Sequence, residues 1–262
     1  MPEKTKKEFF LALDFKSPEE AHATATNALD FLAKEFPDDL GIFDTPLDGP
    51  HYPDPKIVGV KVNIDQVTGP VNRKLNDFKN IFADLKIVHG PDTGERILTA
   101  LSANLPNVRY VTVGAVLGPT ILRQYVEMAK KHSMEVVAFT AHTKIPEQEV
   151  QSMFGGQSLD DVIYTLGKCA ADAGCHAMVL EAERLKDPRI RSLPIKKLVT
   201  GIRIDAEDKG TQSRVTTLET LREQIDAVDM IVVSSRYLQN EYALKHYFST
   251  LLNVRRGEVP QS

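Results

Sequence analysis

The sequence contains only two cysteines, Cys169 and Cys175, among 262 residues. Two cysteines cannot form the disulfide framework of a small secreted domain, and these two lack the paired spacing of a zinc site. Long apolar runs are also missing, because the run at residues 9–13 ends at Asp14 and is too short for the core of a signal peptide. No stretch approaches the ~20 apolar residues that cross a bilayer. We therefore expect a soluble, cytoplasmic protein with reduced thiols.

No charge of either sign dominates the chain. It carries 32 Lys and Arg against 36 Asp and Glu, which gives a formal net charge of −4. This near balance supplies no electrostatic reason to bind nucleic acid or an anionic membrane, so we expect neither partner. The chain is also too hydrophobic, at 42%, for a disordered protein, and it is long enough to bury a large core.

Short apolar runs instead alternate with longer segments of helical period. The runs that we interpret as strands are residues 9–14, 56–64, 81–87, 108–113, 134–140, 176–180, 197–203 and 230–233. Several carry apolar residues on both of their alternating faces, as strands do when both faces of a parallel sheet are buried. The helical segments follow a capping signal at Ser17, or occupy residues 93–103, 120–131, 158–173, 217–225, 239–252 and, less clearly, 71–78.

Eight strands, most of them followed by a helix, predict an α/β fold of the (β/α)8 barrel type, with residues 1–262 as one domain. The alternative is a doubly wound open sheet, which would carry a glycine-rich turn after its first strand. Residues 14–18 hold no glycine, so the barrel is favoured. Residues 37–55 hold five of the fifteen prolines and are predicted to form an insertion loop at the N-terminal face of the barrel.

Charged residues near the ends of the predicted strands are the candidates for catalysis, because barrel enzymes carry their active sites there. Asp84 and Lys86 lie two positions apart on one strand, so their side chains face the same side. Lys61, on the neighbouring strand, can join them in the barrel interior. Charges are costly to bury without a role, so we interpret the three as a functional cluster rather than a surface ion pair.

A second polar group follows the last two predicted strands, where barrels of this type commonly bind phosphate. It comprises Arg203, Gln212 and Arg236. Arginine suits this task because its planar guanidinium binds two phosphate oxygens at once. The polar segment 205–211 between these residues has the composition of a lid.

Residues 84–93 read Asp-Leu-Lys-Ile-Val-His-Gly-Pro-Asp-Thr. This segment resembles the Asp-x-Lys-x-x-Asp-Ile-Pro-Asn-Thr signature of the orotidine 5′-monophosphate (OMP) decarboxylase family. The similarity continues, in the same order along the chain, at Leu13-Asp14, Val60-Lys61-Val62, Gly201-Ile202-Arg203, Gln212-Ser213-Arg214-Val215 and Ser235-Arg236.

The resemblance implies a cofactor-free lyase of pyrimidine biosynthesis that converts OMP to uridine monophosphate (UMP). It implies that Lys86 donates a proton to C6 of the pyrimidine, with Asp84 beside the substrate carboxylate. Lys61 and Asp14 would hold the ribose hydroxyls, and Thr143 would lie beside the pyrimidine. The implied 5′-phosphate ligands are Arg203, Gln212, Arg236 and the backbone at Ser235.

The same resemblance implies a homodimer with shared active sites, in which Thr93 acts across the interface. His89 replaces the second aspartate of the signature and so removes one negative charge from the site. It could serve as a neutral substitute, a pH-dependent cation or a different general base.

Two alternative functions stay open. A repurposed nucleotide- or sugar-phosphate-binding member of the same barrel suite would keep the phosphate ligands without the chemistry, and His89 favours this alternative. A magnesium-dependent hexulose- or keto-gulonate-phosphate enzyme would carry a metal-binding glutamate in place of Lys61. We therefore expect no metal ion and no cofactor.

Overall fold

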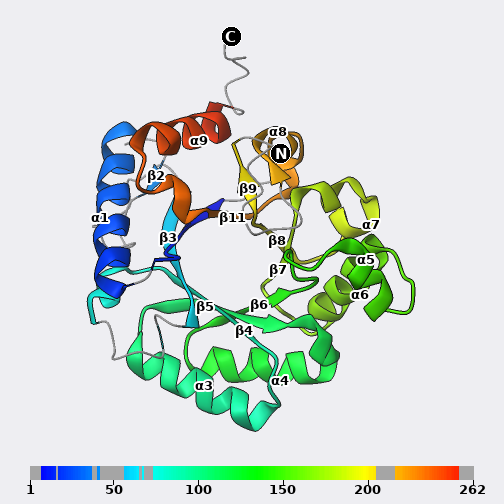
Figure 1. Cartoon of the computed structure of the whole chain (residues 1–262). Helices are drawn as coiled ribbons and strands as arrows, with labels where there is room; N and C mark the ends of the chain where they lie inside the picture. The colour runs from blue at the N-terminus through cyan, green and yellow to red at the C-terminus, as the bar shows by residue number, and fades with distance from the viewer. Residues whose placement is uncertain are drawn as a thin grey trace, which may run out of the picture.

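The computed structural model describes residues 7–15, 17–36, 40–41, 56–64, 67, 73–204 and 216–253. Parallel strands in this part of the chain form a closed barrel surrounded by helices (Figure 1). The sheet closes because β1, Glu8–Ala12, pairs with β3, Lys56–Val62, on one side and with β11, Met230–Val233, on the other. From β3 to β11 the remaining barrel strands are β4 (Ile81–Ile87), β5 (Val108–Gly114), β6 (Glu135–Phe139), β7 (Ala177–Leu180) and β8 (Lys196–Val199). The predicted (β/α)8 barrel is confirmed.

Helices form where the capping and periodicity signals placed them. Ser17 caps the first helix by accepting a hydrogen bond from the Glu20 amide at 3.1 Å, and Pro18 occupies its first turn. The helices at the predicted segments are α1 (Pro18–Glu35), α3 (Pro91–Asn104), α4 (Gly118–Lys131), α6 (Leu159–Asp172), α8 (Leu218–Gln224) and α9 (Glu241–Asn253). The weak helical signal at 71–78 corresponds to a 3-10 helix, Arg73–Asp77. No helix in this part of the chain is both long and apolar enough to cross a membrane.

Two short helices were not predicted. They are α5, Glu147–Met153, and α7, Pro188–Arg191. Each contributes one buried side chain, Val150 and Ile190 respectively, which is too little to produce a recognisable helical period.

The predicted strand at 197–203 is not continuous, which corrects that expectation. β8 ends at Val199, and the chain turns at Gly201, whose φ of +76° lies in the left-handed region that favours glycine. Ile202–Arg203 then form β9, which pairs with β10, Thr216–Thr217, in a separate two-stranded sheet. The turn carries Arg203 out of the barrel wall.

The predicted insertion at 37–55 contains a short strand where only loop was expected. β2, Leu40–Gly41, pairs in parallel with Lys56–Ile57 at the start of β3. This pairing puts Leu40–Gly41 at the N-terminal end of β3, on the face where the insertion was predicted. The other residues of this segment lie outside the described part of the chain.

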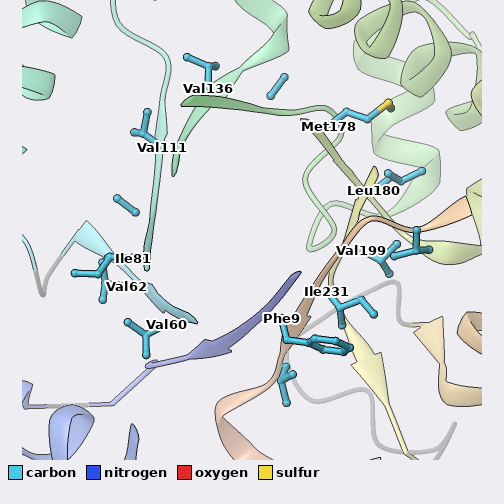
Figure 2. Packing of buried hydrophobic residues seen from close by; sticks show 14 of the residues in the cluster. Phe9, Val60, Val62, Ile81, Val111, Val136, Met178, Leu180, Val199 and Ile231 are labelled. Atoms are coloured by element: carbon cyan, nitrogen blue, oxygen red, sulfur yellow. The ribbon is translucent and has the colours of Figure 1, made fainter. Parts of the chain in front are cut away.

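Along each barrel strand, residues that face the barrel interior alternate with residues that face the surrounding helices. The outward set, which includes Phe9, Val60 and Ile231, packs against the helices (Figure 2). The inward set includes Phe10, Phe82 and Tyr110, whose rings meet edge to face with centroids 5.4–6.5 Å apart. This apolar layer fills the middle of the barrel. Inward-facing polar side chains lie on both sides of this layer: on the N-terminal side Tyr110 donates to the Glu8 carboxylate at 2.9 Å, and on the C-terminal side polar side chains surround the mouth of the barrel.

Candidate active site

A cavity of about 710 Å³ opens at the C-terminal ends of the barrel strands. Its lining comes from segments far apart in the sequence, which the barrel brings to one mouth. The sequence-predicted site residues that line it are Asp14, Lys61, Asp84, Lys86, Thr143, Arg203, Ser235 and Arg236. Gln212 lies outside the described residues.

Four of these side chains form a row of alternating charge at one side of the cavity. The Lys86 ammonium donates to Oδ2 of Asp84 at 2.7 Å, and Nζ of Lys61 lies 3.6 Å from the same oxygen. Lys61 also donates to Oδ1 of Asp14 at 3.0 Å. The structure thus joins the Asp84–Lys86 pair and Lys61 as the strand spacing predicted. Separations this short couple the charges strongly.

Asn63 extends the row, although it was not among the predicted site residues. Its side-chain oxygen accepts from Lys61 at 2.8 Å, and its Nδ2 donates to Oδ1 of Asp14 at 2.5 Å. The spacing Lys61-x-Asn63 repeats the same-face spacing of Asp84-x-Lys86 on the next strand. That repetition was the available signal.

The environment of Asp84 keeps its carboxyl ionised. Its side chain is only 17% exposed, and burial on its own would raise its pKa. The positive charges of Lys61 and Lys86, together with hydrogen bonds from Lys86 and Thr112, outweigh burial and hold the pKa of Asp84 below its ordinary value. A ligand carboxylate placed beside Asp84 would therefore meet a fixed negative charge.

Two arginines line the same cavity from the segments that follow β8 and β11. Arg203 is buried on β9, where its Nη1 donates to the Ile202 carbonyl at 2.9 Å, and Arg236 lies exposed on the 3-10 helix Ser235–Tyr237. The two segments are tied together because the Ile204 amide donates to Oη of Tyr237 at 3.0 Å. This arrangement suits an anion such as a phosphate, whose oxygens could accept from both arginines.

The loop after β6 adds residues that the sequence did not reveal. His142 and Lys144 line the cavity, and the Lys144 amide donates to Nδ1 of His142 at 3.2 Å. Across the described lining, the cationic side chains outnumber the two carboxylates of Asp14 and Asp84. The cations are Lys61, Lys86, Lys144, Arg203 and Arg236. The cavity therefore favours a ligand with several negative charges.

His89 and Thr93 do not reach this cavity within one chain. His89 is exposed in the turn between β4 and α3, and its carbonyl accepts a hydrogen bond from Tyr125 at 2.9 Å. Thr93 lies in the first turn of α3 and accepts from Arg96 at 3.1 Å. Neither side chain is near enough to line the site that holds Lys86.

The described residues do not form a metal-binding site. Nowhere in that part of the chain do three His, Cys, Asp or Glu side chains gather as metal ligands would. The two carboxylates of the cavity are instead bridged by the Lys61 ammonium.

Comparison with known proteins gives the same family as the motifs. Two curated relatives are named orotidine 5′-phosphate decarboxylase. That of Nautilia profundicola is 29% identical over 168 residues, covering 62% of this chain and 70% of the relative. That of Bradyrhizobium sp. is 27% identical over 161 residues, covering 61% of this chain and 65% of the relative.

Solved structures share the fold at lower sequence identity. The orotidine 5′-phosphate decarboxylase of Lactobacillus acidophilus superposes with a TM-score of 0.65 at 16% identity, covering 94% of this chain and 99% of that one. The Methanocaldococcus jannaschii enzyme, solved with an inhibitor, gives a TM-score of 0.64 at 17% identity and the same coverage. The family model "Orotidine 5′-phosphate decarboxylase / HUMPS family" matches residues 53–241, which include the Asp84–Lys86 pair, Lys61 and both arginines. The chain belongs to this family.

Proposed function

We propose that this protein is a decarboxylase that converts OMP to UMP without a cofactor. The observation that carries the proposal is that one cavity is lined both by the charge row Asp14–Lys61–Asp84–Lys86 and by Arg203 and Arg236. A nucleoside monophosphate with an acidic base has negative charge at both ends. It therefore complements both the lysines of the row and the arginines.

In the proposed reaction the 5′-phosphate binds the arginines, and the pyrimidine carboxylate lies beside Asp84. Repulsion from the ionised Asp84 disfavours the bound substrate relative to a transition state in which the carboxylate charge is leaving. The bond between C6 and the carboxyl carbon breaks, carbon dioxide departs, and the electron pair stays on C6. The Lys86 ammonium stabilises this carbanion and protonates it, and Lys86 then regains a proton from solvent.

Conversion of OMP by the purified full-length protein tests the proposal. Chromatography should show UMP appearing in step with the loss of OMP, and released carbon dioxide should match it one to one. Binding of UMP without any conversion would favour the alternative function, a nucleotide-binding protein that kept the phosphate ligands.

The phosphate assignment predicts a selective loss of affinity. Replacing Arg236 with alanine should weaken UMP binding about 10- to 100-fold, since a charge-assisted contact contributes about 1.5–3 kcal/mol. Uridine lacks the phosphate, so its affinity should not change. Isothermal titration of both ligands makes the comparison, with Arg123→Ala on α4 as a control at an exposed arginine outside the cavity. Equal UMP affinities for wild type and Arg236→Ala would refute the assignment.

We also propose that the protein acts as a homodimer. Ile64, Val88 and Val116 follow the neighbouring strands β3, β4 and β5, and each is more than half exposed. Large apolar side chains grouped at one rim are typical of a protein interface. His89 is the next residue after Val88, so a second copy on this rim would bring His89 and α3 toward the partner's cavity. Sedimentation velocity should therefore give a dimer.

The dimer gives His89 a testable role. Restoring the signature carboxylate with His89→Asp should raise kcat/KM at neutral pH, because a second negative charge would favour the cationic form of the lysine that stabilises the carbanion. The measurement is kcat/KM for both proteins between pH 5.5 and 8. A variant slower than wild type at every pH would show that histidine has its own role in this protein.

A further inference from the structure

The strand that carries Asp84 and Lys86 is irregular at these residues. Ala83 pairs with Val111 and Ile87 with Val113, so four steps along β4 oppose two steps along β5. The intervening residues form a bulge that leaves the regular ladder. Within it Lys86 has a φ of +50°, a left-handed conformation that among the described non-glycine residues only Ser133 shares. A lysine holds such a backbone only where surrounding contacts enforce it.

The Lys86 backbone is in contact with Thr112 on β5. The Lys86 amide, which has left the ladder, donates to Oγ1 of Thr112 at 2.7 Å. The same hydroxyl donates to Oδ1 of Asp84 at 3.1 Å. A hydroxyl has one donor and can also accept, so Thr112 makes both bonds at once. It thus connects the backbone of the lysine to the side chain of the aspartate.

Thr112 also determines which oxygen of Asp84 faces the lysines. Oδ1 accepts from Thr112, whereas Oδ2 accepts from Lys86 at 2.7 Å and lies 3.6 Å from Lys61. Rotation of the carboxylate would break at least one of these contacts. Thr112 is fully buried and is not part of the cavity lining. It can therefore act on a ligand only through its neighbours.

We propose that Thr112 is a positioning residue for the charged row, holding Lys86 in its left-handed conformation and fixing the orientation of the Asp84 carboxylate. For its effect on turnover this inference rests on the proposed decarboxylase function. Without the hydroxyl, the Lys86 amide and Oδ1 of Asp84 both lose their hydrogen bond to Thr112. The Asp84 carboxylate can then rotate, and its Oδ2 is no longer held at the Lys86 ammonium.

The experiment compares Thr112→Val, which keeps the shape and removes the hydroxyl, with Thr112→Ser, which keeps the hydroxyl. In the full-length protein Thr112→Val should lower kcat for OMP about tenfold or more, the effect of losing a hydrogen bond to a charged group, with KM changed less than about threefold. Thr112→Ser should restore most of kcat. Thr26→Val removes a hydroxyl that bonds the His22 carbonyl on α1, and it should leave both constants unchanged.

A second readout is independent of turnover. Carbon-13 NMR titration of labelled aspartate, assigned with Asp84→Asn, should show a higher pKa for Asp84 in Thr112→Val than in wild type or Thr112→Ser, because the Thr112 bond favours the ionised carboxylate. Thr112→Ala provides the same comparison if valine prevents folding.

The outcomes separate the two proposals. An unchanged Asp84 pKa in the valine and alanine variants would overturn the role of Thr112, whatever happens to kcat, and so would an unchanged kcat in an active enzyme. A wild type that does not convert OMP would refute the decarboxylase proposal alone, because the pKa comparison would still decide whether Thr112 positions Asp84.

Discussion

Replacing Lys86 with alanine should abolish decarboxylation. The Lys86 ammonium donates a hydrogen bond to Asp84 at 2.7 Å, and the Lys86 side chain, which lines the cavity, is 39% exposed. In the proposed reaction it both stabilises the carbanion and supplies the proton. General acid catalysis contributes about 10²–10⁴-fold and electrostatic stabilisation about 10²–10³-fold, so kcat should fall by at least about 10⁴-fold.

The chain offers a matched control for this variant. Lys168 and Asp172 form a similar pair on α6, with Nζ and Oδ2 2.6 Å apart, but both side chains are more than half exposed. Lys168→Ala removes a lysine from an aspartate at nearly the same distance and should leave kcat unchanged. UMP affinity of Lys86→Ala, measured by titration, should stay close to wild type, because the arginines proposed to bind the phosphate are intact. Turnover by Lys86→Ala within tenfold of wild type would remove Lys86 from the mechanism.

Replacing Asp84 with asparagine should lower both activity and stability. Loss of the charge removes the repulsion that destabilises the bound carboxylate, so kcat should fall about a hundredfold or more while OMP binds no more weakly. Two lysines then share the site, and among the described residues Asp14 is the carboxylate that remains beside Lys61. Removing one partner of a buried ion pair costs about 3–5 kcal/mol of stability. We expect about 3 kcal/mol here, because water can still reach Lys86. Thermal unfolding should occur about 6–12 °C lower.

The stability of wild type and of Asp84→Asn should depend differently on pH. The pKa of Asp84 is lowered in the folded state, so its ionisation stabilises the fold above the unfolded pKa of ~3.9. That stabilisation is lost as the pH falls from about 4 through the folded pKa. Chemical denaturation should therefore show a smaller loss of stability below pH 4 for Asp84→Asn than for wild type. Asp172→Asn, in the exposed pair on α6, should follow the wild-type curve, and parallel curves for wild type and Asp84→Asn would contradict the assignment.

The barrel and most of the charged row could be predicted because each depends on local periodicity. The strands are apolar on both faces, and Asp84-x-Lys86 puts two charges on one face of a strand without reference to distant residues. Lys61 followed from the order of neighbouring strands in a barrel. The turn at Gly201 was missed, because a positive φ depends on where the chain must go next as well as on the presence of glycine.

The contacts that orient the row could not be predicted. In the sequence Thr112 is one of three threonines in the predicted strands, and only the bulge in β4 places it against Lys86 and Asp84. A bulge arises from the pairing of two strands and produces no recognisable periodicity in the sequence of either strand. The exposed position of His89 likewise depends on the turn before α3, and the role proposed for it depends on a second chain.

The most direct test of the account is the fall in OMP absorbance with protein purified from a host that lacks its own OMP decarboxylase, in the presence of a metal chelator. Wild type should convert OMP completely to UMP at a rate proportional to protein concentration and unaffected by the chelator, while Lys86→Ala purified in parallel gives none. Binding of UMP with no fall in OMP absorbance at any protein concentration would contradict the proposed decarboxylase.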